Sequence, residues 1–116
     1  MDALELELEL IEQEGLFELA QNLSSVYVGG GTPSLFGAGA MEGLGRLLGR
    51  ARLTGNDLEW TAEANPESLT QELVVDWSKA GVNRVSIGIQ SFDDVVLRWM
   101  GRLHGSEGAI SAVNLC

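Results

Sequence analysis

The sequence predicts an α/β fold in which parallel β/α units form part of a TIM-like (β/α) barrel. The first observation is that helical and strand-like segments alternate along the 116 residues, and this order implies parallel strands joined by right-handed crossovers. The order alone fits either an open sheet or a slice of a barrel. The second observation is that the strands have one apolar face and one small or polar face, which is typical of a barrel with a ligand cavity.

The first element, over about residues 3–21, is predicted to be a helix. The leucines from Leu4 to Leu10 alternate with glutamates, which is the period of a strand, although both residue types are strong helix formers. Helical spacing of the apolar residues from Ile11 to Ala20 decides for a helix. Its acidic start is interpreted as a solvated helix face.

Three strands and four further helices follow. Strands are predicted near residues 25–29, 58–64 and 84–90, and helices over 38–52, 70–80, 95–103 and 107–115. Thr70 is typical of a helix start and Gly81 of a helix end. Asp93 and Asp94 favour the start of the next helix, and Gly105 is expected to separate the last two.

The period of two assigns the strand faces. Glu63 lies on the inner side of the second strand, opposite to the side that faces the helices, and Ser86 and Gln90 lie on the inner side of the third. For Glu63 the alternatives are a salt bridge to Arg84 or exposure in a loop. The residues predicted to face the helices are Trp60, Ala62, Ala64, Val85, Ile87 and Ile89.

The first strand ends in the run Gly29-Gly30-Gly31-Thr32-Pro33-Ser34. Glycines permit positive φ and close approach of a ligand to the backbone, and Thr32 adds a hydroxyl. A P-loop is excluded because its Gly-Lys-Ser/Thr is missing, and a dinucleotide fingerprint would place its third glycine on Ser34. A plain tight turn between strand and helix is the alternative.

The other two strands also end in polar residues, within the segments 63–67 and 88–92. Ligands of parallel α/β folds gather at the carboxyl ends of the strands. The three polar strand ends are therefore expected to meet at one site.

The composition of the chain argues against two classes of binding partner. The net charge is −10, and seven acidic residues lie within the first 18 positions, ahead of the first basic residue, Arg46. Such a charge repels nucleic acid and anionic membranes, so neither is expected as a partner. No apolar stretch approaches a membrane span and no export signal is recognised, so a cytoplasmic location is expected. The single cysteine, Cys116, cannot by itself hold zinc or an iron–sulfur cluster.

Several of these segments together resemble a known family. The segments that carry the resemblance are Gly29-Gly30-Gly31-Thr32-Pro33-Ser34, 63–67 (Glu-Ala-Asn-Pro-Glu), 81–92 (Gly-Val-Asn-Arg-Val-Ser-Ile-Gly-Ile-Gln-Ser-Phe) and Gly101-Arg102-Leu103-His104. In this order they look like the corresponding segments of radical S-adenosylmethionine (SAM) proteins. The most similar branch is that of oxygen-independent coproporphyrinogen III oxidases. Within this branch, the Gln-Ser-Phe and Gly-Arg-x-His motifs are more similar to those of the haem chaperones.

The resemblance implies a site for S-adenosylmethionine. It assigns Gly30, Gly31 and Thr32 to the methionine portion, Glu63 and Gln90 to polar groups of the ligand, and Arg102 to its carboxylate. These roles suit the residue types, since arginine forms a charge-assisted fork with a carboxylate. His104 is interpreted as a surface or capping histidine.

One departure from the family pattern is expected to matter. The cluster motif C-x-x-x-C-x-x-C of this family is absent from the chain, and three thiolates are needed to hold the 4Fe-4S cluster. We therefore expect residues 1–116 to be an internal fragment of a radical SAM core domain, without the cluster-binding N-terminus and the later barrel strands. The fragment alone is expected to be catalytically silent.

Three functions remain open at this point. A haem chaperone, with haem as its partner, is favoured because the Gly-Arg-Leu-His motif resembles that of the chaperone branch. The alternative is an oxygen-independent coproporphyrinogen III oxidase, which acts on a porphyrinogen. A degenerate, non-catalytic α/β interaction domain is the third.

Overall fold

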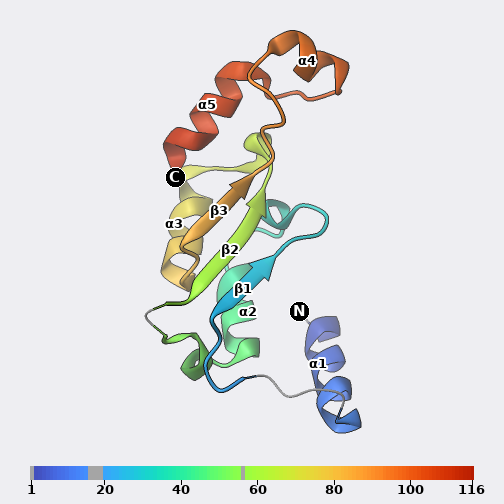
Figure 1. Cartoon of the computed structure of the whole chain (residues 1–116), viewed down its shortest axis with the longest axis vertical. Coiled ribbons are helices and arrows are strands. Elements are labelled where there is room, and N and C mark those ends of the chain that lie inside the picture. The colour runs from blue at the N-terminus through green and yellow to red at the C-terminus, as the bar shows by residue number, and fades with distance from the viewer. Residues whose placement is uncertain (1, 16–19, 56) are drawn as a thin grey trace.

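The computed structural model describes residues 2–15, 20–55 and 57–116. Helices and strands alternate along the chain, with a sheet at the centre (Figure 1). The elements are α1 (Asp2–Glu14), β1 (Ser25–Val28), α2 (Ala40–Leu48), β2 (Glu59–Ala64), α3 (Gln71–Ala80), β3 (Arg84–Ile87), α4 (Asp94–Trp99) and α5 (Gly105–Leu115). Short 3₁₀ helices, η1 (Pro33–Leu35), η2 (Arg50–Leu53) and η3 (Pro66–Ser68), lie in the connections.

The sheet has the order β1-β2-β3, and both strand pairs are parallel. The register places Val28 beside Ala62, and Ala62 beside Val85. All three strands therefore end at the same edge of the sheet. The predicted α/β fold of parallel β/α units is confirmed.

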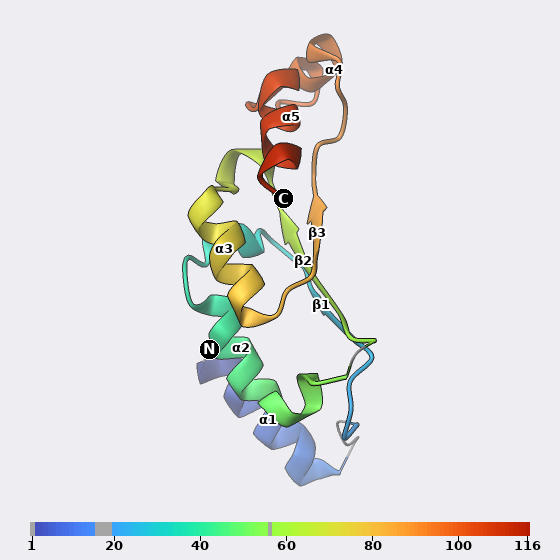
Figure 2. The same cartoon turned by 90° about the vertical axis from the view of Figure 1, so that its left-hand side faces the viewer.

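One face of the sheet carries the helices. Figure 2 shows α2 and α3 on this side, while no described helix covers the opposite face. Trp60, Ala62 and Ala64 of β2 are buried against Met41 of α2 and Trp77 of α3. The predicted direction of these β2 side chains is confirmed, and Val85 and Ile87 pack against the same core as predicted.

Two glycines, Gly45 and Gly81, border the buried indole of Trp60. A Cβ added to Gly45 of α2 would lie 3.2 Å from the Trp60 ring, and one added to Gly81 would lie 3.4 Å from it. Gly81 also has a φ of +113° where it ends α3, a conformation that favours glycine. Gly45 therefore lets α2 approach the indole closely, whereas Gly81 is favoured by the backbone conformation that ends α3.

Several predicted boundaries differ from the structure, and glycines explain most of the differences. The first helix ends at Glu14, before the left-handed Gly15, and not near residue 21; residues 16–19 of the prediction lie outside the described part. The second is confined to 40–48 by Gly39 and Gly49, and α4 ends at Trp99, before the left-handed Gly101. Strand β3 stops at Ile87 instead of 90, because the Ile89 amide turns back to the Ile87 carbonyl (2.8 Å).

Helix α1 lies at the margin of the fold. It has no buried residue, and Leu4, Leu6 and Leu10 are exposed. Its helical conformation confirms the choice made from the sequence against the strand-like alternation. Among the described helices, none has the length and apolar character needed to cross a membrane.

Candidate functional site

The carboxyl ends of the three strands form one pocket of about 290 Å³. Parallel strands deliver their ends to one edge of the sheet, so segments far apart in the sequence meet there. The residues that line the pocket are Gly31, Thr32, Pro33, Glu63, Ala64, Asn65, Ser86, Gly88 and Gln90. The predicted convergence of the polar strand ends is therefore present in the structure.

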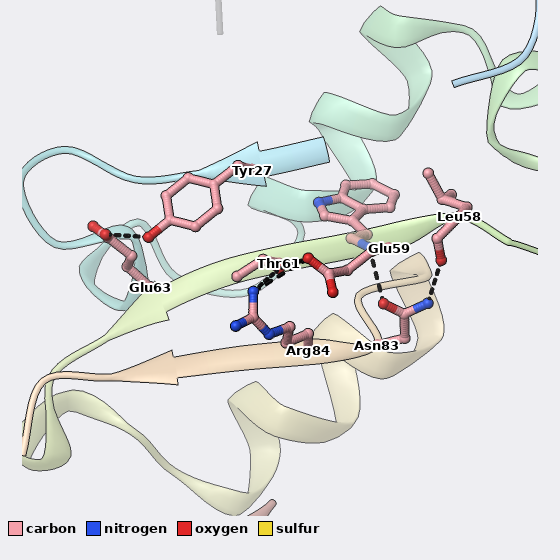
Figure 3. A network of polar contacts seen from close by, with 8 residues as sticks. Tyr27, Leu58, Glu59, Thr61, Glu63, Asn83 and Arg84 are labelled. Atoms are coloured by element: carbon pink, nitrogen blue, oxygen red, sulfur yellow. Dashed lines mark hydrogen bonds and ion pairs between the residues drawn. The ribbon is translucent and has the colours of Figure 1, made fainter. Parts of the chain in front are cut away.

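Glu63 is the acidic group of this pocket, and two donors from the β1 side hold its carboxylate, of which Figure 3 shows Tyr27. The Tyr27 hydroxyl donates to Oε1 at 2.6 Å, and the Gly30 amide donates to Oε2 at 3.2 Å. The hydrogen bond to Glu63, followed by desolvation and by repulsion from the carboxylate, raises the pKa of Tyr27 above its ordinary value. The carboxylate is thus oriented before any ligand arrives.

The alternative in which Glu63 pairs with Arg84 is wrong. Arg84 donates instead to Glu59 at 3.2 Å and to Thr61 at 3.4 Å, toward the amino end of the sheet (Figure 3). The register explains this choice, because Thr61 lies between Tyr27 and Arg84 on neighbouring strands. These two larger neighbours also bury Thr61 on a face that no described helix covers.

The glycine run presents open backbone to the pocket. Gly30 and Gly31 have φ of +87° and +68°, and no atom lies within 4 Å of the position where a Cβ would stand. At Gly29 the constraint is space, since a Cβ would lie 2.7 Å from the Tyr27 ring. Thr32 accepts a hydrogen bond from the Asn65 amide group at 3.4 Å. Positive φ and close packing account for the three glycines, and the bare backbone is accessible to a ligand.

The polar side chains of Asn65, Gln90 and Arg102 lie close to Gly88. A Cβ at this position would lie 3.1 Å from Asn65 Oδ1, 3.3 Å from Gln90 Nε2 and 3.3 Å from Arg102 Nη2. Arg102 donates to the Gly88 carbonyl at 3.0 Å. Four of the six predicted site residues line the pocket: Gly31, Thr32, Glu63 and Gln90. Gly30 donates a hydrogen bond to Glu63, and Arg102 lies outside the lining and donates to the Gly88 carbonyl.

The sequence prediction missed three polar contributors, Tyr27, Asn65 and Ser86. Tyr27 is bonded to Glu63, while Asn65 and Ser86 line the pocket. The period of two placed Ser86 on the inner side, and Asn65 stands in a motif already singled out, so both carried a usable signal. His104 was interpreted as a surface or capping residue; it occupies the N-cap position of α5, but its side chain is only 1% exposed and makes no capping bond.

No group of three or more His, Cys, Asp or Glu side chains in the described ranges is placed to hold a metal ion. The chain has one cysteine, Cys116, which is exposed at its end.

A sequence model described as the radical SAM superfamily matches residues 2–116. The chain belongs to the radical SAM superfamily. Relatives of this radical SAM chain include haem chaperone HemW of Escherichia coli, 41% identical over 107 residues, and the mitochondrial radical S-adenosyl methionine domain-containing protein 1 of Bos taurus, 37% identical over 106 residues. Each alignment covers 90% of the radical SAM chain, but only 28% and 24% of the relative.

A solved structure supports the same assignment. The coproporphyrinogen III oxidase HemN of Escherichia coli, described as a radical SAM enzyme, superimposes with a TM-score of 0.75 at 27% identity. The match covers 96% of the radical SAM chain and 25% of that structure. The radical SAM chain therefore spans about a quarter of the length of the proteins it matches.

Proposed function

We propose that this chain contributes part of the S-adenosylmethionine site of a radical SAM protein of the haem chaperone type. The observation that carries the proposal is the meeting of Glu63, the glycine run and Gln90 in one pocket. Family membership supports S-adenosylmethionine as the ligand. The polar lining suits it, because ribose hydroxyls and an ammonium group need carboxylate and carbonyl acceptors.

The proposed roles follow the chemistry of each group. The exposed backbone of Gly30 and Gly31, with the Thr32 hydroxyl, binds the methionine portion. Glu63 and Gln90 bind polar groups of the ligand, and Arg102 binds the carboxylate through a charge-assisted contact. The Tyr27 and Gly30 donors hold Glu63 in place for this task.

The residues fit S-adenosylmethionine but not the iron–sulfur cluster. One cysteine cannot supply the thiolates of a 4Fe-4S centre, so we assign its ligands to residues outside this chain. When the cluster and S-adenosylmethionine are bound together, they supply radical chemistry. The residues of this chain bind and orient the ligand.

The haem chaperone is favoured over the oxidase by two observations. The Gly101-Arg102-Leu103-His104 motif resembles that of the chaperone branch, and the relatives named as haem chaperones reach 41% identity. The oxidase remains the second candidate because of the structural match to HemN. Haem as a partner and a cytoplasmic location are parts of the proposal, and no residue of this chain is assigned to haem.

Calorimetric titration of S-adenosylmethionine into the complete encoded protein tests the site. Glu63→Ala removes a charged acceptor, so we expect binding to weaken by about 1 to 3 kcal/mol, roughly 5- to 150-fold. Glu59→Ala is the matched control, because Glu59 lies on the same face of β2 at its other end and pairs with Arg84. Equal affinity of both variants, or no binding by the wild type, would overturn the proposal.

A further inference from the structure

Gln90 lies in a strained turn at the pocket. Its φ is +69°, and it is the one non-glycine residue with positive φ among the described residues. The Ser91 amide donates to the Ile89 carbonyl at 2.9 Å, so residues 89–91 form a γ-turn centred on Gln90. The form with positive φ is the rarer and more strained one, and such backbone persists only where its surroundings hold it.

The side chain of His104 supplies one of the restraints on this turn. Its Nε2 atom lies 3.1 Å from the Ile89 carbonyl oxygen, the same oxygen that closes the turn. A carbonyl can only accept a hydrogen bond, so Nε2 must carry the proton. Arg102 holds the preceding carbonyl, that of Gly88, at 3.0 Å. Arg102 and His104, two residues apart in the sequence, thus contact the consecutive carbonyl oxygens that precede Gln90.

The other ring nitrogen of His104 faces an acid. Nδ1 lies 3.3 Å from Glu67 Oε2, and the His104 side chain is 1% exposed, whereas that of Glu67 is 40% exposed. The Glu67 carboxylate therefore lies on the side of the ring opposite to the Ile89 carbonyl, while Nδ1 itself makes no hydrogen bond within the described part of the chain. Because Glu67 belongs to η3, against which α5 packs, the contact ties the segment after β2 to the segment after β3.

We infer that His104 is a positioning residue that, together with Glu67, holds the γ-turn which presents Gln90 to the pocket. The ligand side of this inference rests on the proposed function, whereas the restraint on the turn does not. Loss of the Nε2 donor releases the Ile89 carbonyl and relaxes the strained turn. Loss of the Glu67 carboxylate removes the charged group that lies 3.3 Å from the ring on its other side.

Nitrogen NMR of the imidazole in the full chain tests the proton positions, and the spectrum is unambiguous because the sequence has one histidine. We expect a proton on Nε2, the nitrogen that lies against the Ile89 carbonyl. A ring that carries its proton on Nδ1 and none on Nε2 would overturn the inference.

Amide hydrogen exchange at Ser91 measures closure of the turn. His104→Gln places an amide donor near the position of Nε2, whereas His104→Asn reaches only as far as Nδ1. We expect exchange at Ser91 to accelerate about tenfold in His104→Asn, the scale of one lost hydrogen bond, and much less in His104→Gln. Equal acceleration in both variants, or none in either, contradicts a role through the Ile89 carbonyl. Should His104→Asn not fold, Glu67→Gln measured in the same way takes its place.

Ligand binding completes the test and separates the two proposals. In the complete encoded protein, His104→Asn should weaken S-adenosylmethionine binding about tenfold, with recovery in His104→Gln. If the wild type binds no S-adenosylmethionine, the proposed function fails while the exchange result still decides the restraint. If the wild type binds and both variants bind equally well, the positioning role of His104 is wrong.

Discussion

At the scale of single residues, Glu63 organises the acceptor side of the pocket. Its carboxylate receives a hydroxyl from β1 and an amide from the glycine run, so one side chain orients two segments. Removal of the carboxylate would leave the Tyr27 hydroxyl and the Gly30 amide without this acceptor. The phenol of Tyr27 reports on this arrangement because the chain has a single tyrosine.

The Tyr27–Glu63 contact predicts a pH dependence. The hydrogen bond to Glu63 raises the pKa of Tyr27, so its contribution to stability is complete below the pKa of an unfolded tyrosine and is lost as pH rises through the folded pKa. We expect Glu63→Gln to lower the pKa of Tyr27 toward its ordinary value in an ultraviolet titration of the phenolate. Glu59→Gln should leave the titration unchanged, and the same curve for all three proteins would refute the coupling.

At the scale of elements, capping and left-handed glycines determine where the helices near the site begin and end. Thr70 accepts a hydrogen bond from the Leu73 amide at the start of α3, and Gly81 ends this helix. Asp93 accepts from the amides of Val95 and Val96 at the start of α4. Each cap satisfies amides that lack partners within the helix.

Thr70→Ala tests the contribution of such a cap. Loss of the bond to the Leu73 amide should lower the free energy of unfolding by about 1 kcal/mol, read as a lower midpoint in urea denaturation. Ser78→Ala, at an exposed position later in α3, serves as the control and should not destabilise, since alanine favours a helix interior. A Thr70→Ala midpoint equal to that of the control would show that the cap contributes nothing.

At the scale of the whole molecule, the sheet is covered by helices on one side and its site lies at one edge. The chain corresponds to about a quarter of its relatives. The pocket residues come from all three strand ends, so the arrangement of the site depends on the sheet as a unit. A substitution that shifts the register of one strand would therefore displace the whole lining.

The composition of the whole chain predicts the result of cluster reconstitution. When the 116-residue chain is treated with iron and sulfide without oxygen, we expect no 4Fe-4S centre, because Cys116 is its single cysteine. Mössbauer spectroscopy measures the cluster, and Cys116→Ser should give the same result as the wild type. One four-iron centre per monomer, with the monomer verified by gel filtration, would contradict this prediction.

The sequence by itself determined the alternation of β/α units, the faces of β2, the family and the chemical character of the strand ends. These features depend on local period and composition, which a single segment carries. Trp60 and Glu63 lie on opposite faces of β2 because their separation in the strand is odd, and the glycine run marks bare backbone wherever it is placed.

Only the tertiary structure decided which polar groups pair. Glu63 bonds Tyr27 rather than Arg84 because the register sets Thr61 between those two residues and Glu63 beyond them. His104 is buried because α5 packs against η3, and β3 ends at Ile87 because the backbone then turns back on itself. The pairing of Glu63 and the burial of His104 depend on distances between segments tens of residues apart, which no local pattern specifies, whereas the end of β3 depends on a backbone turn that the period of two does not reveal.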